Sequence, residues 1–259
     1  EGRVGNEAGG NGLETTQLSN FTATSDNSGA KELWRGPWAG ISRTNWILTN
    51  IDKSPKISDA KKTQYKGEAH FLRGLYYFNL VRLFGDVPWI DKQQTASDDL
   101  QVSRTSKDIV YQHIIDDFSD AASMLPAVYE NTTDIGRATK GAAFGLLAKV
   151  YLTLKRYNET LVAIDSVMNL GVYSLNRKYE WNFSDLRENG PESLFEVQYE
   201  KDVTAYSEFD ILGQGGWHHE YMAPLASINI GGPWGNFGWF AVYPEFVESY
   251  EPGDLRKSV

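Results

Sequence analysis

The chain has 259 residues, which is enough for one large domain or two small ones. Its formal net charge is −9, and an acidic chain without a basic cluster binds nucleic acid and anionic lipid poorly, because phosphate groups attract Lys and Arg. It has no cysteine, which excludes a disulfide or a thiolate metal site within these residues. The sequence contains no apolar run of about 18 residues, so it predicts no membrane-spanning helix. Aromatic residues reach 13%, which indicates large cores or exposed stacking surfaces.

Two helices are predicted in the first third of the chain. Apolar residues recur at helical spacing over residues 33–51, and we expect the Gly36-Pro37 pair near the start of this helix. The next helix, from about residue 64, is apolar on two sides, so it must be buried between neighbours. Its apolar positions are Tyr65, Ala69, Phe71, Leu72, Leu75, Tyr76, Phe78, Leu80 and Leu83. Gly85 ends this helix, Pro88 prevents it from restarting, and the two helices are predicted to form an antiparallel pair.

A second pair of helices is predicted over residues 105–154. Residues 105–108 resemble a capping box with Thr105 at the N-cap, and the helix that follows is closed by Pro126. Its partner, residues 137–154, carries a face of mostly small side chains. These are Gly141, Ala142, Gly145, Ala148 and Leu152. We expect this face to let another helix approach closely.

A third unit begins after the tight turn at residues 155–157. Its apolar face is predicted to consist of Leu161, Ile164, Val167 and Met168, and Gly171 stands where a left-handed glycine ends a helix. Helix pairs joined by short turns resemble degenerate tetratricopeptide repeats. The fold class is therefore predicted as mainly α, an irregular tetratricopeptide-like stack of helical pairs over residues 31–172.

The composition changes after residue 173. Residues 173–259 are predicted to form a loop-rich, aromatic-rich region with short strands, one of them at residues 194–199, where Phe195, Val197 and Tyr199 alternate onto one side. Glycines and tryptophans interleave between residues 213 and 238. We expect the two regions to belong to a single domain over residues 1–259.

Several motifs carry a resemblance to a known family. They are Glu68-Ala69, Phe71-Leu72-Arg73, Leu75-Tyr76-Tyr77-Phe78, the run from Leu80 to Pro88, Arg137-x-Thr139-Lys140-Gly141-Ala142, Leu147 to Leu152, Glu192 to Gln198, and Asp254-Leu255-Arg256. In content, order and spacing they resemble the SusD/RagB family of outer-membrane, glycan-binding lipoproteins of Bacteroidetes. Most members have Ala in place of Gly74 and an aliphatic residue in place of Trp89. The resemblance covers about residues 34–259, and the family's usual length implies that an N-terminal lipid anchor and a C-terminal part lie outside this chain.

The sequence contains two patterns that catalysis or metal binding would use. His218-His219-Glu220 lacks metal-ligand spacing, because adjacent residues of a loop point to different sides, so we interpret it as polar loop residues. The adjacent acids Asp98-Asp99 and Asp116-Asp117 are poor candidates for a glycosidase pair, since neighbours on a helix diverge by about 100°. We expect them to be solvated surface charges. No cofactor, metal or catalytic residue is predicted.

The region of residues 213–240 is the best candidate for ligand binding. Sugar rings pack their C–H faces on aromatic rings, while amides bond the hydroxyls, and glycines let a loop bring several rings together. The candidate ligand-binding residues are Trp217, Tyr221, Asn229, Trp234, Asn236 and Trp239. The alternative is that these rings pack the loops onto the helices or against a partner protein. The tryptophans Trp34, Trp38 and Trp46 are predicted to lie in the core.

The resemblance implies a function without catalysis. It implies capture of an oligo- or polysaccharide at the cell surface, by a lipid-anchored protein of the outer membrane, and delivery to a SusC-like TonB-dependent transporter. The resemblance supplies no ligand motif that transfers to numbered positions. An alternative is a helical-repeat scaffold that binds a peptide or protein, because some family members take up peptides. A groove with paired acceptors and charges would favour that alternative, whereas exposed coplanar aromatics would favour sugar.

Overall fold

The computed structural model describes residues 17, 21–98, 100–198 and 248–254 of the chain. Its contacts divide the chain into two compact units, one of residues 34–197 and one of residues 1–33 with 198–259. The first unit holds the helical stack and is described below. Its α-helices are α2 (Ser28–Asn50, from residue 34 onward), α3 (Asp59–Phe84), α4 (Lys107–Met124), α5 (Lys140–Thr153) and α6 (Tyr157–Met168). Short 3₁₀ helices lie at Ile51–Lys53, Thr132–Asp134, Tyr179–Phe183 and Asp185–Arg187.

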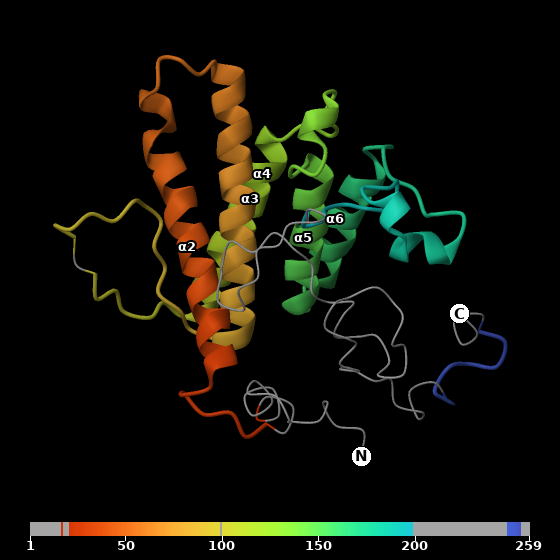
Figure 1. Ribbon diagram of the computed structural model, residues 1–259, viewed down its shortest axis with the longest axis horizontal. Helices are drawn as coiled ribbons and strands as arrows, with labels where there is room; N and C mark the ends of the chain where they lie inside the picture. Colours follow the sequence, from red (N-terminus) through yellow and green to blue (C-terminus); the bar gives the residue numbers. More distant parts are fainter. Residues whose placement is uncertain (1–16, 18–20, 99, 199–247, 255–259) are drawn as a thin grey trace, which may run out of the picture. The chain divides into compact units, whose positions relative to one another are not determined.

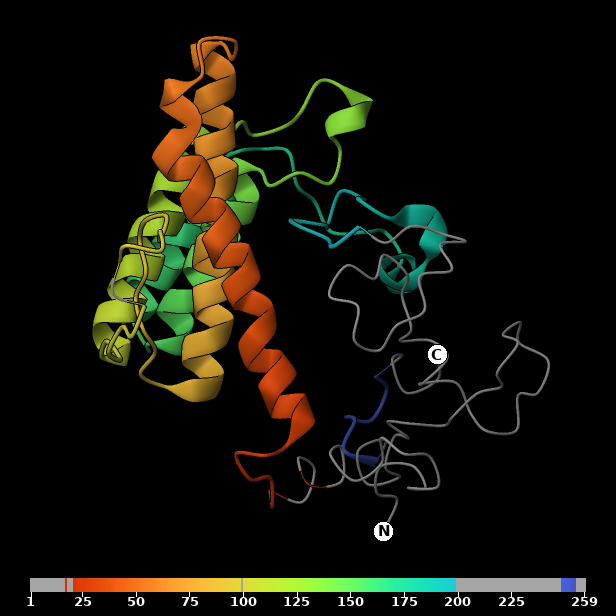
Figure 2. The ribbon, with the colours of Figure 1, turned by 60° about the vertical axis from the view of Figure 1, so that its left-hand side comes forward.

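The helices of this unit pack in chain order. Helix α3 packs on α4, α4 on α5, and α5 on α6. Helices α2 and α3 lie side by side and antiparallel in two views (Figures 1 and 2). This stack of helices, packed in chain order, confirms the mainly α, tetratricopeptide-like prediction. The only strand-like pairing among the described residues is an isolated bridge between Val87 and Thr105. The strand predicted at residues 194–199 is not found over its described part, residues 194–198.

Helix α3 begins and ends where its sequence signals indicate. The Ser58 side chain accepts a hydrogen bond from the Lys61 N–H at 3.4 Å, as N-cap serines do. Gly85 takes a left-handed φ of 70° and closes the helix. Large side chains on both sides of α3 are buried, including Phe71, Tyr77, Phe78 and Leu80. The predicted central, two-sided helix is confirmed.

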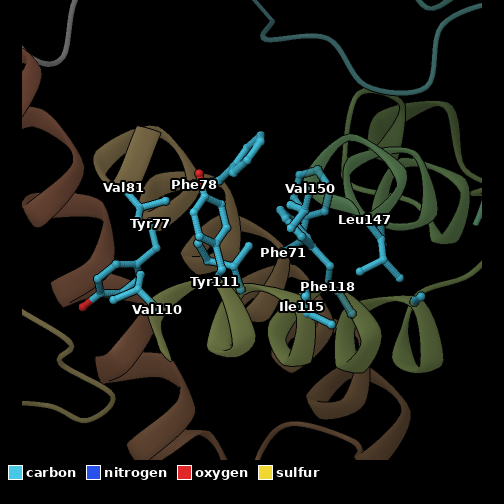
Figure 3. Close-up of a cluster of buried hydrophobic side chains, with 14 of the residues drawn as sticks. Phe71, Tyr77, Phe78, Val81, Val110, Tyr111, Ile115, Phe118, Leu147 and Val150 are labelled. Carbon is cyan, nitrogen blue, oxygen red and sulfur yellow. The ribbon is translucent and has the colours of Figure 1, made fainter. Parts of the chain in front are cut away.

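The core forms where α3, α4 and α5 meet (Figure 3). Phe71 of α3 stands edge-on to Phe118 of α4, with ring centroids 5.9 Å apart. Val150 and Leu147 of α5 close the cluster from the other side. Each fully buried side chain of this size stabilises the fold by about 1.5–3 kcal/mol relative to exposure.

Helix α2 differs from the prediction at its start. It begins at Ser28, so Pro37 lies inside it and not near its first turn. A proline inside a helix removes one backbone hydrogen bond, and packing of the surrounding aromatic rings offsets that loss: Trp38 stands edge-on to Tyr77 at 5.9 Å. Gly40 is in close contact with the Tyr76 ring, and a Cβ there would clash. The glycine therefore sets how closely α2 approaches α3.

Helix α4 is capped differently from the predicted capping box. Its N-cap is Ser106, whose side chain makes no capping bond. The Asp86 Oδ1 atom accepts a hydrogen bond from the Lys107 N–H at 2.8 Å instead, which places a carboxylate at the positive end of the helix. Thr105 uses its backbone N–H to bond the Val87 carbonyl at 2.9 Å. The capping box was wrong because a residue distant in sequence supplies the acceptor.

Helix α6 buries a different face from the one predicted. Its buried residues are Thr160, Ala163 and Val167. Of the four residues predicted to form the apolar face, only Val167 is buried, while Leu161 and Met168 are 60% and 67% exposed. Small side chains face α5 because the two helices pack closely, so the larger apolar residues lie outside. Gly171 has a φ of 67°, which confirms its predicted left-handed conformation.

Candidate functional site

The loop between α4 and α5 is tied to α3 by one carboxylate. The Arg137 guanidinium donates two hydrogen bonds to Glu68, from Nε to Oε1 at 2.9 Å and from Nη2 to Oε2 at 2.7 Å. The Tyr129 hydroxyl oxygen lies 3.2 Å from the same carboxylate and 2.9 Å from the Ala138 carbonyl oxygen, so its one proton can bond either acceptor. The bonds to Glu68 raise the pKa of Arg137, and burial followed by the Glu68 charge raises the pKa of Tyr129. Two motifs that are 69 residues apart therefore meet in one bidentate pair.

Two glycines of α5 receive side chains from the segment after α6. Gly141 lies against the Tyr173 ring, where a Cβ would clash, and a Cβ on Gly145 would lie 2.7 Å from Leu194. The Tyr173 hydroxyl pairs with Thr139 Oγ1 at 2.9 Å. The prediction that this small-residue face receives another helix is therefore wrong at both glycines. They admit the irregular segment of residues 172–196, and Leu152 of the same predicted face is exposed.

A pocket lies between the α4–α5 loop and this segment. Its volume is about 260 Å³. The loop contributes Tyr129, Arg137 and Thr139, and the segment contributes Tyr173, Phe195 and Glu196. Phe195 is held by the core, because its ring lies 4.9 Å from the Phe71 ring. The lining combines aromatic surface with hydroxyl, guanidinium and carboxylate groups, which suits a ligand that is both flat and rich in hydroxyls.

The predicted ligand-binding residues lie outside the described residues. Trp217, Tyr221, Asn229, Trp234, Asn236 and Trp239 all fall within residues 199–247, as does His218-His219-Glu220. Their roles stay predictions. The pocket residues were not predicted as a site, because the motifs at residues 137–142 and 192–198 were used only as evidence of the family resemblance. The signal that would have pointed to them is the contact between Glu68 and Arg137, which sequence spacing does not show.

One of the predicted surface acids is buried. Asp117 accepts hydrogen bonds from Arg73 Nε at 2.9 Å and Arg73 Nη2 at 2.7 Å, and its Oδ1 lies 2.7 Å from His70 Nδ1. Arg73 also donates to Asn45 Oδ1 at 2.9 Å. The prediction of a solvated pair holds for exposed Asp116 and is wrong for Asp117, because a buried arginine on α3 needs a counter-charge. A carboxylate occupied in this way is not available as a glycosidase acid or nucleophile.

The described part of the chain shows neither a metal cluster nor a membrane span. Among those residues, no group of three or more His, Asp or Glu side chains is placed to hold a metal ion. None of the helices in the described ranges is long and apolar enough to cross a membrane.

Comparison with known proteins gives consistent matches. A family model described as "Starch-binding associating with outer membrane" matches residues 5–152. The SusD-like protein P25 of Formosa agariphila is 25% identical over 203 residues, which cover 74% of this chain and 38% of that protein. The chain spans about half or less of the length of the curated relatives that it matches, among them the SusD-like protein P2 of Formosa agariphila, of which it covers 47%.

Solved structures match the fold as well. A structure described as a laminarin-binding SusD-like protein is 28% identical, with a TM-score of 0.68 over 76% of this chain and 43% of that one. A SusD superfamily protein from Parabacteroides distasonis is 28% identical, with a TM-score of 0.82 over 94% of this chain and 51% of that one.

Proposed function

The chain belongs to the SusD-like family of starch-binding proteins associated with the outer membrane, and on that basis we propose that it binds a neutral glycan at the cell surface without catalysing a reaction. The observation that carries this proposal is its similarity to a solved structure described as laminarin-binding, at 28% identity and a TM-score of 0.68. Starch and laminarin are both glucans without charged groups. The acidic chain, with its net charge of −9, is compatible with such a ligand and unfavourable for a polyanion.

We propose that the main ligand-binding surface lies in residues 213–240, which the sequence predicts to be aromatic-rich loops. Trp217, Tyr221, Trp234 and Trp239 would stack on sugar rings, and Asn229 and Asn236 would bond hydroxyls. Each aromatic contact contributes on the order of 1 kcal/mol beyond burial, by analogy with aromatic pairs. A few such contacts give dissociation constants in the ~mM to μM range, or about −4 to −8 kcal/mol.

The proposal includes a location and a partner. The family description supports association with the outer membrane. We propose that a lipid anchor outside this chain holds the protein at the cell surface, and that a SusC-like TonB-dependent transporter receives the glycan.

Isothermal titration calorimetry of the intact protein tests the binding proposal. The panel contains starch oligosaccharides, laminarin oligosaccharides and oligopeptides, titrated into the wild type and into Trp217→Ala and Trp234→Ala. Trp46→Ala is the matched control, because Trp46 lies on α2 and is 57% exposed, so its predicted place in the core was wrong. We expect glucan binding that falls in the loop variants and not in the control. Binding of peptides alone would overturn the proposal in favour of peptide uptake.

A further inference from the structure

A second pocket adjoins the first within the segment after α6. Its volume is about 180 Å³, and the two pockets share Gly190, Ser193 and Glu196 in their linings. Pockets that enclose drug-sized ligands have volumes of about 300–1,000 Å³. Each pocket alone is smaller than that range, whereas the two together reach it. A ligand made of repeated small units fits such a pair better than one compact molecule does.

The second pocket contains one aromatic platform. Trp181 lines it and is partly buried, and the Arg187 guanidinium lies 4.2 Å from the centre of the indole ring. The arginine covers one face and fixes the orientation of the ring, because cation–π contacts favour a charge over the ring face. The remaining accessible ring surface can pack against the C–H groups of a sugar. Phe183, two residues away and 74% exposed, is not part of this lining.

Hydrogen bonds within the segment keep the second pocket in shape. The Asn176 N–H donates to Glu192 Oε2 at 2.8 Å, and Asn176 Nδ2 donates to Asn182 Oδ1 at 2.6 Å. The Asn189 N–H donates to Glu196 Oε2 at 2.9 Å. A pocket that is already ordered binds more tightly, because less conformational freedom is lost on binding.

The charges of the second pocket select the class of ligand. The lining contains three residues with carboxylates, Glu188, Glu192 and Glu196, and one with a guanidinium, Arg187. An acidic sugar would meet net negative charge, which opposes binding. The hydroxyls of a neutral sugar can donate to carboxylates and accept from amide and guanidinium N–H groups.

We propose that the two pockets are adjacent subsites for successive units of one neutral oligosaccharide, with Trp181 as the stacking platform of the second. This inference rests on the proposed function, because it names part of the surface that would hold the glycan. It predicts a minimum ligand of two units, since each pocket takes about one. It also predicts rejection of uronic acid oligomers of the same length.

Calorimetry with oligomers of defined length tests the inference. The probes are glucose oligomers of one to six units from laminarin and from starch, with mannuronate oligomers of matched length. We expect affinity to rise at least tenfold from one unit to two or three in the wild type. Trp181→Ala should weaken binding of the trimer about five- to tenfold, and Trp181→Phe should recover part of that loss. Phe183→Ala is the matched control and should keep the wild-type affinity.

A second variant separates binding from folding. Asn182 is exposed and packs in no core cluster, so Asn182→Ala should leave the melting temperature unchanged and weaken trimer binding about threefold. Wild-type affinity in both Trp181→Ala and Asn182→Ala would overturn the subsite inference and leave glycan binding through residues 213–240 intact. A wild-type protein that binds no oligosaccharide would overturn both proposals. Equal affinity for mannuronate and glucose oligomers would overturn the predicted selection by charge.

Discussion

Two polar clusters of this molecule use similar side chains in opposite ways. In the helical stack, buried Arg73 is surrounded by Asp117, Asn45 and the Asp91 carbonyl. In the segment after α6, Asn176, Asn182 and Arg187 lie at the edge of a pocket with partly accessible neighbours. The first cluster directs its polar groups at one another, so it stabilises the fold. The second uses some of its groups to keep its shape and leaves others facing the pocket, so it can bind a ligand.

The largest expected effect comes from removing the counter-charge in the stack. Asp117→Ala leaves Arg73 buried without its carboxylate, which should lower the free energy of unfolding by about 3–5 kcal/mol. Urea denaturation measures the loss. Asp116→Ala is the matched control, because the Asp116 carboxylate accepts a hydrogen bond from exposed Gln112 and should change stability by less than about 0.5 kcal/mol when removed. Equal losses of unfolding free energy in the two variants would show that the buried cluster around Arg73 does not stabilise the fold more than an exposed acid does.

The next largest effect on stability is expected from replacing Trp89. Its ring stacks on the His113 ring, with centroids 4.3 Å apart and planes 10° from parallel, and its centroid also lies 4.3 Å from that of the Tyr77 ring. Most members of the SusD-like family have an aliphatic residue at this position. Trp89→Leu should lower the free energy of unfolding by about 1–3 kcal/mol, because each aromatic pair adds about 0.5–1.5 kcal/mol to the contribution of burial. His113→Ala should lower it by less. If Trp89→Leu stabilises the protein in thermal denaturation, the stack does not depend on these rings.

Gly141 connects the stack to the first pocket. An alanine there clashes with the Tyr173 ring, so Gly141→Ala should move Tyr173 and weaken glucan binding several-fold. The net loss of stability should be small, because alanine raises helix propensity by about 1 kcal/mol. Tyr173→Phe removes only the hydroxyl that pairs with Thr139 and should cost about 0.5–1.5 kcal/mol without the same loss of binding. A Gly141→Ala variant that keeps the wild-type affinity would contradict the claim that the packing of α5 on Tyr173 affects ligand binding in the first pocket.

The smallest effect is a pH dependence at an exposed loop. Hydrogen bonds from the Thr95 hydroxyl and backbone N–H lower the pKa of Asp98, with Lys92 adding to the effect. The stability that this carboxylate contributes is fully present above the ordinary Asp pKa of about 3.9. It is lost as the pH falls through the lower pKa of the folded state. Thr95→Ala should raise the pKa of Asp98 in an NMR titration of its carboxyl carbon, and an unchanged pKa would contradict the assigned cause.

The sequence predicted the helices of the stack better than their surroundings. The periodicity of α3 and the left-handed Gly85 and Gly171 follow local rules, so neighbouring residues were enough to predict them. The cap of α4 by Asp86 could not be predicted, because the acceptor comes from another part of the chain. Nor could the burial of Asp117, since adjacent acids look alike until a buried arginine pairs with one of them.

The candidate site was predicted in part and by composition alone. Residues 213–240 were selected for their aromatic and glycine content, and they lie outside the described residues. The pockets at residues 127–196 depend on Tyr173 and Leu194 seating against glycines of α5. Those contacts join residues about 30 to 50 positions apart on irregular backbone, where periodicity gives no signal. Whether residues 1–259 form one domain stays a prediction.

The most direct test of the division between scaffold and site measures two quantities on one set of variants. The free energy of unfolding and the dissociation constant for a laminarin trimer would be determined for the wild type, Asp117→Ala, Trp89→Leu and Trp181→Ala, at a temperature where all are folded. We expect the two stack variants to lose stability and keep their affinity, and Trp181→Ala to lose affinity and keep its stability. Affinity that falls in proportion to stability across all three variants would contradict that division.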